Sequence, residues 1–395
     1  MTGHDASTRD RPSGTPDHGE RPTDGTVTVP DPGAVTAWAG ASGRAIPPEL
    51  GVVPGSLDRG GGATPSFSVP PDASLGLPAT PAPTRIGPRT FHWGARTHVM
   101  GVLNVTPDSF SGDGLLGAGD RWIDAAVAQA ARMVEEGADI LDVGGESSRP
   151  GHAPVDVADE VRRVVPVVAA VRAAHPGVPL SVDTVKPAVA AAAIDAGADL
   201  VNDIWGVAED DALSRLAADR GVPIVLMHNR AEARYTSLLS EIVADLQRAI
   251  DRAVRAGVPW ESILVDPGFG FGKAPAHNLA LLRDLAVLRV LGRPVLLGTS
   301  RKSTLGKVLD LPPEERLEAT LATTALAVAA GVDVVRVHDV RPNVRVARMA
   351  DAVVRAGAGA PTGAGARAAE HPGGAAEAAG AVDPVATTPD DGRRR

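Results

Sequence analysis

A four-residue pattern recurs seven times in the middle of this chain, and it constrains the fold more than any other feature. Each copy reads glycine, a variable residue, aspartate or proline, and then an apolar residue. Glycine ends helices readily because it adopts the left-handed conformation, and the residue after next prevents the helix from continuing. We therefore expect each copy to join the end of a helix to the start of a buried strand. The copies begin at Gly137, Gly177, Gly197, Gly221, Gly257, Gly292 and Gly331.

The segments around these copies predict strands that alternate with helices. The apolar run from Val99 to Leu103 is typical of a strand buried on both faces, and it brings the total to eight strands. The first predicted helix, with Asp120 as its candidate N-cap, carries apolar residues along one face. These are Ile123, Ala126, Val127, Ala130 and Val134. Such alternation forms parallel βαβ units, and eight strands favour an α/β fold of the (β/α)8 TIM barrel type over an open doubly wound sheet.

The two ends of the 395-residue chain differ in composition from its middle. Residues 1–88 are rich in Gly, Pro, Ser, Thr and Asp, and residues 358–395 are rich in Gly, Ala and Pro. Such segments bury too little apolar surface to offset the entropy that ordering costs. We therefore predict disordered N- and C-terminal extensions around one barrel domain, residues 89–357.

Composition also argues against several classes of protein. The chain has no cysteine, which excludes disulfides and thiolate metal ligands, and its formal net charge of −9 argues against nucleic-acid binding. The first residues lack the basic and apolar regions of a secretory leader, and no stretch is long enough to span a bilayer. We expect a soluble cytoplasmic protein that binds neither nucleic acid nor membranes.

Polar side chains follow nearly every predicted strand. In a barrel the carboxyl ends of all strands meet at one mouth. There, Asp and Asn can pair with ring N–H and amino groups, and Lys and Arg can meet ring acceptors and anions. Any one of these residues could be a helix cap, but their succession indicates a site for a heteroaromatic ring and a phosphate. In chain order they are Asn104, Asp142 with Glu146, Asp183, Asn202 with Asp203, Met227 with His228, Asp266, Ser300 to Lys302, and Arg336 with His338.

Five motifs resemble, in the same order, those of the dihydropteroate synthase family of folate-pathway enzymes. They are Met100 to Ser111, Asp142 to Gly151, Asp266 to Lys273, Gly298 to Ser303, and Arg336 to Val340. The resemblance covers roughly residues 91–355 and includes neither extension. It implies a pterin-binding barrel that transfers an alkyl group other than methyl and that forms a homodimer.

The resemblance implies one set of residues for the pterin ring. Hydrogen bonds to the ring are implied for Asp183, Asn202, Asp266 and Lys302. Met227 and Phe271 would flank the ring as apolar walls, and the guanidinium of Arg336 would stack on its face. From the sequence alone, Asp266 could instead be a cap before Pro267, and Met227 could be ordinary core.

A second set is implied for the diphosphate. Asn104, Arg336 and His338 would hold it, together with the start of a helix near Arg341 and Pro342.

A third set is implied for p-aminobenzoate. Lys302 and Ser300 lie where the family binds this substrate. Two loops, residues 105–117 and 144–154, would close over the diphosphate and form the p-aminobenzoate pocket. Phe110 and Pro150 would supply its walls, and Ser148 and Arg149 would contact the anion.

The implied reaction displaces diphosphate from 6-hydroxymethyl-7,8-dihydropterin diphosphate by the amine of p-aminobenzoate and gives 7,8-dihydropteroate. It needs no covalent nucleophile on the protein. Charge on the departing diphosphate calls for Mg²⁺, with Asn104 as its implied protein ligand. The implied catalytic residues are Asn104, Lys302, Arg336 and His338.

Three stretches depart from the usual family motifs. Ser147-Ser148 stands where Ser-Thr is common, and residues 111–114 read Ser-Gly-Asp-Gly instead of Ser-Asp-Gly-Gly. Residues 227–230 read Met-His-Asn-Arg where Met-His-Met is more familiar. None of these changes removes an implied role.

Three other functions were weighed against this one. A pterin-binding methyltransferase domain shares the barrel but would not need the Ser300 to Ser303 and Arg336 to His338 groups. A catalytically silent binding protein predicts losses at Asn104, Lys302 or Arg336, and all three are present. A phosphosugar enzyme would explain the phosphate site but not five ordered motifs.

Overall fold

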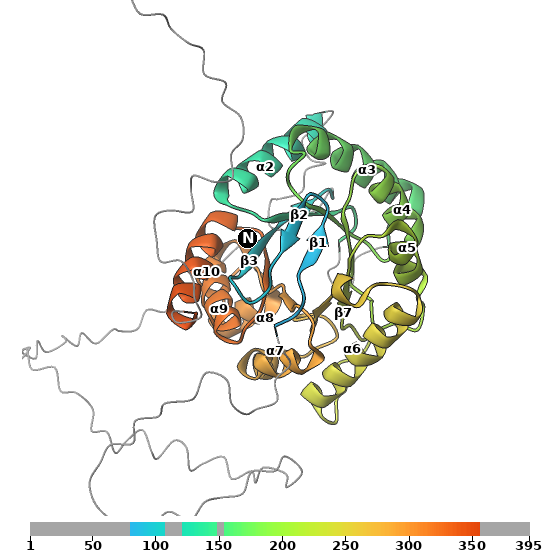
Figure 1. Cartoon of the computed structure of the whole chain (residues 1–395). Helices are drawn as coiled ribbons and strands as arrows, with labels where there is room; N and C mark the ends of the chain where they lie inside the picture. Colours follow the sequence, from blue (N-terminus) through green and yellow to red (C-terminus); the bar gives the residue numbers. More distant parts are fainter. Residues whose placement is uncertain (1–79, 107–120, 148–153, 356–395) are drawn as a thin grey trace, which may run out of the picture. The chain divides into compact units, whose positions relative to one another are not determined.

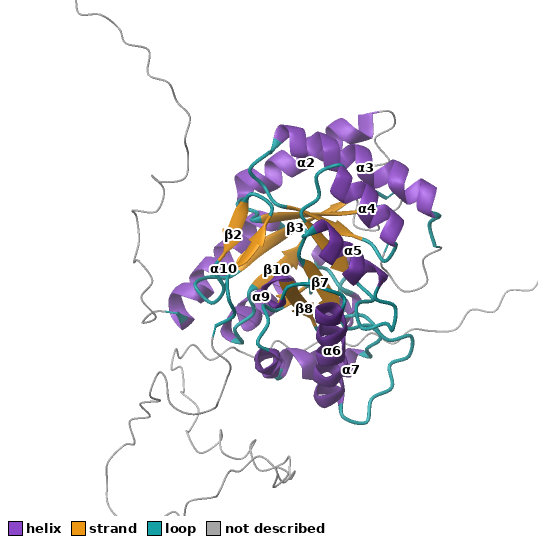
Figure 2. Cartoon of the chain, turned by 45° about the vertical axis from the view of Figure 1, so that its right-hand side comes forward, coloured by secondary structure: helices purple, strands orange, loops and turns teal. Residues whose placement is uncertain are grey.

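The computed structural model describes residues 80–106, 121–147 and 154–355. Eight parallel strands form a ring with helices packed around it, seen end-on in Figure 1 and turned in Figure 2. The strands are β3 (His98–Asn104), β4 (Ile140–Gly144), β5 (Leu180–Asp183), β6 (Leu200–Asp203), β7 (Ile224–Met227), β8 (Ile263–Asp266), β9 (Leu296–Leu297) and β10 (Val334–Val337). The predicted (β/α)8 barrel is confirmed.

The order of the strands around the ring follows the chain, and the last strand, β10, pairs with the first, β3; as a series of paired strands the order runs from β8 down to β3 and on through β10 to β9. The two ends of this series, β8 and β9, then meet and close the ring. Val265 forms a parallel bridge with Val295, and its N–H donates to the carbonyl of Pro294 at 3.0 Å. A closed ring brings the carboxyl ends of all eight strands to one mouth.

Helices follow the strands as the alternation predicts. They are α2 (Trp122–Glu136), α3 (Val157–Ala174), α4 (Pro187–Asp195), α5 (Ala212–Arg220), α6 (Leu238–Arg255), α7 (Pro275–Arg283), α8 (Ser303–Leu309), α9 (Leu317–Ala329) and α10 (Val340–Val354). Short 3-10 turns cover Trp260–Ser262, Leu285–Leu291 and Pro313–Glu315.

Two helix starts need comment. In α2, Ala126 and Ala130 of the predicted face are buried and Met133 joins them, whereas the candidate cap Asp120 lies outside the described residues. The sequence predicts Pro342 at the first position of the last helix. In the structure α10 begins at Val340, so Pro342 is its third residue. The first N–H groups of a helix have no partner inside it, so proline is tolerated there as well.

Each copy of the glycine pattern precedes a strand, as predicted. At one copy, however, the glycine does not end the helix before it. Six of the seven glycines have a positive φ, from 61° to 114°, as the left-handed helix end requires. Gly177 does not. The helix before it, α3, already ends at Ala174, because Pro176 cannot continue it. The prediction of a left-handed glycine is therefore wrong at this one junction.

A short hairpin closes the barrel at the end opposite the mouth. It pairs β1 (Thr84–Ile86) with β2 (Arg89–Phe91), and in Figure 1 it lies across the centre of the ring. Ile86, Phe91 and Trp93 pack against the barrel interior. Seven strands contribute the apolar residues of this interior: Met100, Ile140, Leu200, Val225, Leu264, Leu296 and Val334.

The hairpin corrects the expected domain boundary. Composition predicts that all of residues 1–88 form a disordered extension, but Thr84 and Ile86 are fully buried. Three residues are too short for a periodic pattern, so this strand escapes detection. The expected disorder of residues 1–79 and 358–395 concerns chain outside the described residues. Among the described helices, none is long and apolar enough to cross a membrane.

The hairpin generates a stability prediction. Trp93 is 3% exposed, stacks on Phe91 at 5.6 Å between ring centroids, and donates from Nε1 to Thr84 Oγ1 at 2.9 Å. Trp93→Ala should therefore lower the free energy of unfolding by about 3–5 kcal/mol in urea denaturation. Trp205→Ala, at a 39% exposed position, is the control. Equal losses in the two variants would contradict a sealing role for the hairpin.

Candidate active site

The predicted ring-binding residues converge at the mouth of the barrel. Arg336 at the end of β10 donates from Nε to Asp142 Oδ2 at 2.6 Å and from Nη2 to Asp183 Oδ2 at 2.7 Å. Asn202 donates to the same oxygen of Asp142 at 3.1 Å. Three of these four residues were predicted for the ring. Asp142 ends a predicted strand and has no predicted role, yet it lies at the centre of the group.

The parallel register explains this convergence. Asp183 on β5 lies beside Asn202 on β6, and Met227 on β7 lies beside Asp266 on β8. Gly144 on β4 separates Asn104 from Asp183 in the same row, because it pairs with both. Its missing side chain leaves this part of the mouth open.

Burial makes the charges in this group interact strongly. Burial, reinforced by Asp142, raises the pKa of Asp183 to about 7, although Arg336 opposes the shift. Burial alone would lower the pKa of Arg336, but the two aspartates outweigh it and raise that pKa. Asp142 is fully buried, and its Oδ1 has no hydrogen-bond partner among the described residues. A buried carboxylate oxygen without a donor is costly, so a ligand N–H is its natural partner.

A second group surrounds Asp266, which is 5% exposed. Its Oδ1 accepts the N–H of Gly268 at 2.7 Å, and burial raises its pKa. Lys302 donates to the carbonyl of Phe269, and its ammonium lies 4.3 Å from the ring centroid of Phe271. Burial lowers the pKa of Lys302 to about 8, against the opposing charge of Asp266. A carboxylate, an ammonium and an aromatic wall thus share one side of the mouth.

A glycine is required beside Lys302. Gly270 has a φ of 83°, and a Cβ there would lie 2.8 Å from Cδ of Lys302. Any other residue would strain the loop and displace the lysine.

A third group gathers at the ends of β9 and β10. His338 Nδ1 lies 3.0 Å from Ser300 Oγ, and that hydroxyl also accepts the N–H of His338 at 3.2 Å. Arg301 forms a bidentate salt bridge with Asp339, the residue just before α10. These contacts hold Ser300 and His338 next to the N-terminus of α10, where an anion is favoured.

The remaining predicted residues fall into two sets. Asn104, half-buried at the end of β3, and Met227, 3% exposed at the end of β7, lie where they were expected. Phe110, Ser148, Arg149 and Pro150 lie outside the described residues, as do most of the two loops that carry them.

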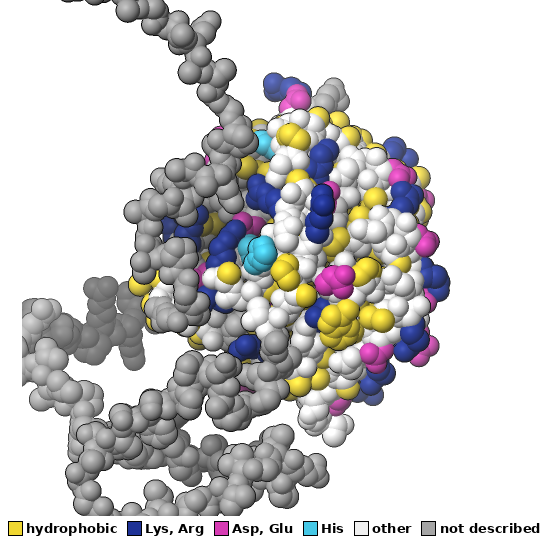
Figure 3. Space-filling view, in the orientation of Figure 1, with side chains coloured by type: hydrophobic (Ala, Val, Ile, Leu, Met, Phe, Trp, Pro, Cys, Tyr) yellow, Lys and Arg dark blue, Asp and Glu magenta, His cyan; other side chains and the backbone are white. Residues whose placement is uncertain are grey.

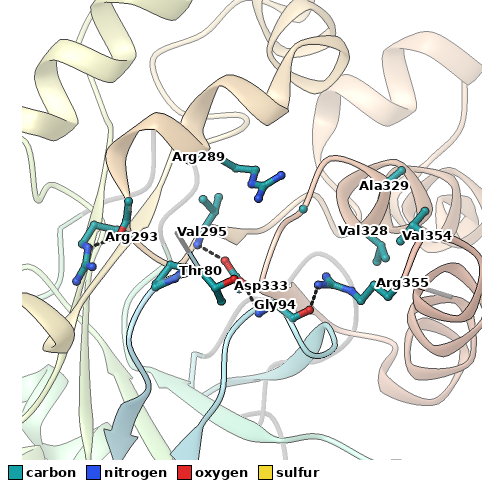
Figure 4. Close-up of a pocket in the computed structure, with 13 residues that line it drawn as sticks. Thr80, Gly94, Arg289, Arg293, Val295, Val328, Ala329, Asp333, Val354 and Arg355 are labelled. Carbon is teal, nitrogen blue, oxygen red and sulfur yellow. Dashed lines mark hydrogen bonds between the residues drawn. The ribbon is translucent and has the colours of Figure 1, made fainter. Parts of the chain in front are cut away.

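A cavity of about 250 Å³ lies at the other end of the barrel (Figure 4). Most of the residues that line it precede a strand, whereas the mouth residues lie at the carboxyl ends of theirs. The carboxylate of Asp333 accepts N–H groups from Gly94 at 3.2 Å and Val295 at 2.9 Å. Arg355 donates to the carbonyl of Gly94. These contacts tie the hairpin to the barrel, so we assign this end a structural role.

Comparison with known proteins agrees with the geometry of the mouth. The model of the family "Pterin binding enzyme" matches residues 100–338. The dihydropteroate synthase of Clostridium beijerinckii is 47% identical over 272 residues, which cover 69% of this chain and 99% of the relative.

Solved structures are similar along the same stretch. Dihydropteroate synthase from Clostridium difficile, determined with pteroic acid, has a TM-score of 0.63 at 45% identity and covers 67% of this chain and 99% of its own. The enzyme from Xanthomonas albilineans, determined with 4-aminobenzoic acid, has a TM-score of 0.65 at 42% identity and covers 69% and 98%. The chain therefore belongs to the pterin-binding enzymes. Among these, it is a member of the dihydropteroate synthase family.

The raised pKa of Asp183 and the lowered pKa of Lys302 predict how pterin affinity depends on pH. Asp183 is an ionised acceptor only above a pKa of about 7, and Lys302 is a charged donor only below a pKa of about 8. Affinity for 6-hydroxymethyl-7,8-dihydropterin, measured by calorimetry, should therefore peak between these values and fall on both sides. Asp183→Asn should shrink the acid limb, which Asp266 shares because burial raises its pKa too, and Lys302→Arg should shrink the alkaline limb. Limbs that stay unchanged in both variants would contradict this assignment.

Proposed function

We propose that this chain condenses 6-hydroxymethyl-7,8-dihydropterin diphosphate with p-aminobenzoate to give 7,8-dihydropteroate and diphosphate in folate biosynthesis. The observation that carries the proposal is the buried group of Asp142, Asp183, Asn202 and Arg336, with one carboxylate oxygen left without a donor. Family membership supports it, as do the pteroic acid and 4-aminobenzoic acid found in related structures.

The pterin ring is proposed to lie over this group. Its amino and N–H groups would donate to Asp183, Asp266 and the side-chain oxygen of Asn202, and Lys302 would donate to a ring acceptor. The in-plane N–H groups of Arg336 are directed at two carboxylates, so the flat face of its guanidinium is oriented for stacking. Met227 and Phe271 would bound the ring on its apolar sides.

Bond making and breaking take place at the exocyclic methylene of the pterin. The amine of p-aminobenzoate bonds to this carbon while the carbon–oxygen bond breaks, and the electron pair leaves with the diphosphate. The nitrogen then loses a proton. The protein contributes by orienting the substrates and stabilising charge on the leaving group, for which Arg336 and His338 are the proposed donors.

The mouth also fits Mg²⁺. This ion usually takes one or two protein oxygens and completes its shell with substrate phosphates and water. Asn104 offers an amide oxygen, and the described residues contain no cluster of His, Asp or Glu that would hold a metal alone. When bound with the diphosphate, Mg²⁺ would neutralise charge on the leaving group.

The p-aminobenzoate pocket is proposed to combine Ser300 and Lys302 with Phe110, Ser148, Arg149 and Pro150. Their order in the family motifs supports this assignment.

The proposal extends to assembly and location. We propose a homodimer that works in the cytoplasm, with small-molecule substrates as its ligands and no nucleic acid. Several large apolar side chains are exposed on the adjacent helices α9 and α10, which supports a protein interface there. They are Leu326, Met349, Val353 and Val354. On the face shown in Figure 3, basic and acidic side chains are interspersed among the described residues.

The central test is a coupled assay of diphosphate release. The purified protein with Mg²⁺ should release diphosphate only when the pterin diphosphate and p-aminobenzoate are both present. Chelation of Mg²⁺ should abolish release and added Mg²⁺ should restore it, because the diphosphate would otherwise leave without charge compensation. Turnover of methyltetrahydrofolate without diphosphate release would instead assign the chain to the methyltransferases.

A further inference from the structure

Lys273 is a buried cation at the mouth that the proposed reaction does not use. It follows the loop after β8 and is only 9% exposed. Its ammonium lies 3.1 Å from the carbonyl oxygen of Gly268, 3.1 Å from that of Phe271, and 2.9 Å from His228 Nδ1. An ammonium has three N–H donors, one for each of these close acceptors, and the carbonyl oxygen of His228 lies farther away at 3.5 Å.

The tautomer of His228 is fixed from its other side. His228 is fully buried, and its Nε2 lies 3.2 Å from Asp245 Oδ2. Arg230 donates to the same oxygen at 2.7 Å, so this oxygen accepts from both side chains. Nε2 therefore carries the proton and Nδ1 accepts from Lys273. Burial lowers the pKa of His228 to about 3, with a contribution from the charge of Lys273, so the ring stays neutral.

Gly268 connects this chain of contacts to the pterin site. Its carbonyl accepts from Lys273, while its N–H donates to Asp266 Oδ1 at 2.7 Å. The backbone there is tightly confined: φ is 69°, and a Cβ would lie 1.8 Å from the carbonyl oxygen of His228. The carbonyl and the N–H of Gly268 belong to consecutive peptide units joined at this confined Cα, so a shift of the carbonyl would be passed on to the N–H that holds the carboxylate.

The loop between Gly268 and Phe271 is held by two lysines. Lys273 binds its first and last carbonyls, and Lys302 binds the carbonyl of Phe269 between them. Without Lys273, both the Asp266 carboxylate and the Phe271 ring would lose a fixed support.

We propose that Lys273 is a positioning residue for pterin recognition, which acts through the backbone of Gly268 to orient Asp266. The inference rests on the proposed role of Asp266 in binding the ring. The charge matters as well as the length of the side chain, because a neutral amine offers only two N–H donors to three acceptors. Burial lowers the pKa of Lys273 to about 7 against the opposing charge of Asp266, so its deprotonation also contributes to the alkaline limb of pterin affinity.

The first experiment compares Lys273→Met with Lys307→Met, a control at an exposed position in α8. In calorimetry, Lys273→Met should weaken binding of 6-hydroxymethyl-7,8-dihydropterin by about tenfold or more, and the control should leave it unchanged. The KM for p-aminobenzoate at saturating pterin diphosphate should stay at the wild-type value. Unchanged pterin affinity in a folded Lys273→Met protein would overturn the proposal.

A rescue experiment separates charge from packing. The chain has no cysteine, so Lys273→Cys carries a single thiol that can be alkylated in the unfolded chain before refolding. Aminoethylation rebuilds a side chain with an ammonium and should restore pterin affinity, whereas propylation gives a neutral side chain of the same length and should not. Equal affinity of the two alkylated proteins would overturn the role of the charge.

Asp266→Asn distinguishes the two levels of the proposal. If this variant retains full pterin affinity, the ring-binding role of Asp266 fails and the positioning role fails with it. If Asp266→Asn weakens binding but Lys273→Met does not, only the positioning role is wrong.

Discussion

One guanidinium between two buried carboxylates organises the mouth of this barrel. Arg336 reaches from β10 past β3 to Asp142 on β4 and Asp183 on β5, so its contacts need the last strand of the chain to pair with the first strand of the barrel. Buried charges are tolerated only when they are paired and hydrogen-bonded. The pairing here is incomplete, because two carboxylates share one cation and one oxygen of Asp142 lacks a donor. A ring with several N–H groups supplies what is missing, which links the cost of this arrangement to substrate binding.

The fold and the position of the site could be predicted from the sequence because both depend on local rules. Each glycine with proline or aspartate two residues later precedes a strand, although Gly177 does not itself end a helix, so seven junctions located seven strands. The hydrophobic core does not require polar side chains at the carboxyl ends of the strands. Their succession there therefore indicated a binding site at the mouth of the barrel. Asp183, Asn202, Asp266, Lys302 and Arg336 were identified in this way, and the family resemblance added their roles.

The features that escaped prediction depend on contacts between distant residues. Nothing near Thr84 in the sequence reveals that it meets Trp93 and the carbonyl of Glu261. In the sequence Asp142 does not differ from other aspartates at strand ends, because its partner Arg336 comes from β10, far along the chain. Lys273 lies within a recognised motif, but only the folded chain places it beside His228. Pairwise chemistry across the barrel is therefore what the sequence alone does not reveal.

The most direct test of this central interaction is a double-mutant cycle on the free energy of unfolding, with Arg336→Met, Asp183→Asn and the double variant. Arg336→Met alone leaves two buried carboxylates without their cation and should lower the free energy of unfolding by about 3–5 kcal/mol. Adding Asp183→Asn removes one of them, so the double variant should be more stable than Arg336→Met. Losses that simply add would contradict the account, since they would mean that Arg336 and Asp183 do not depend on each other.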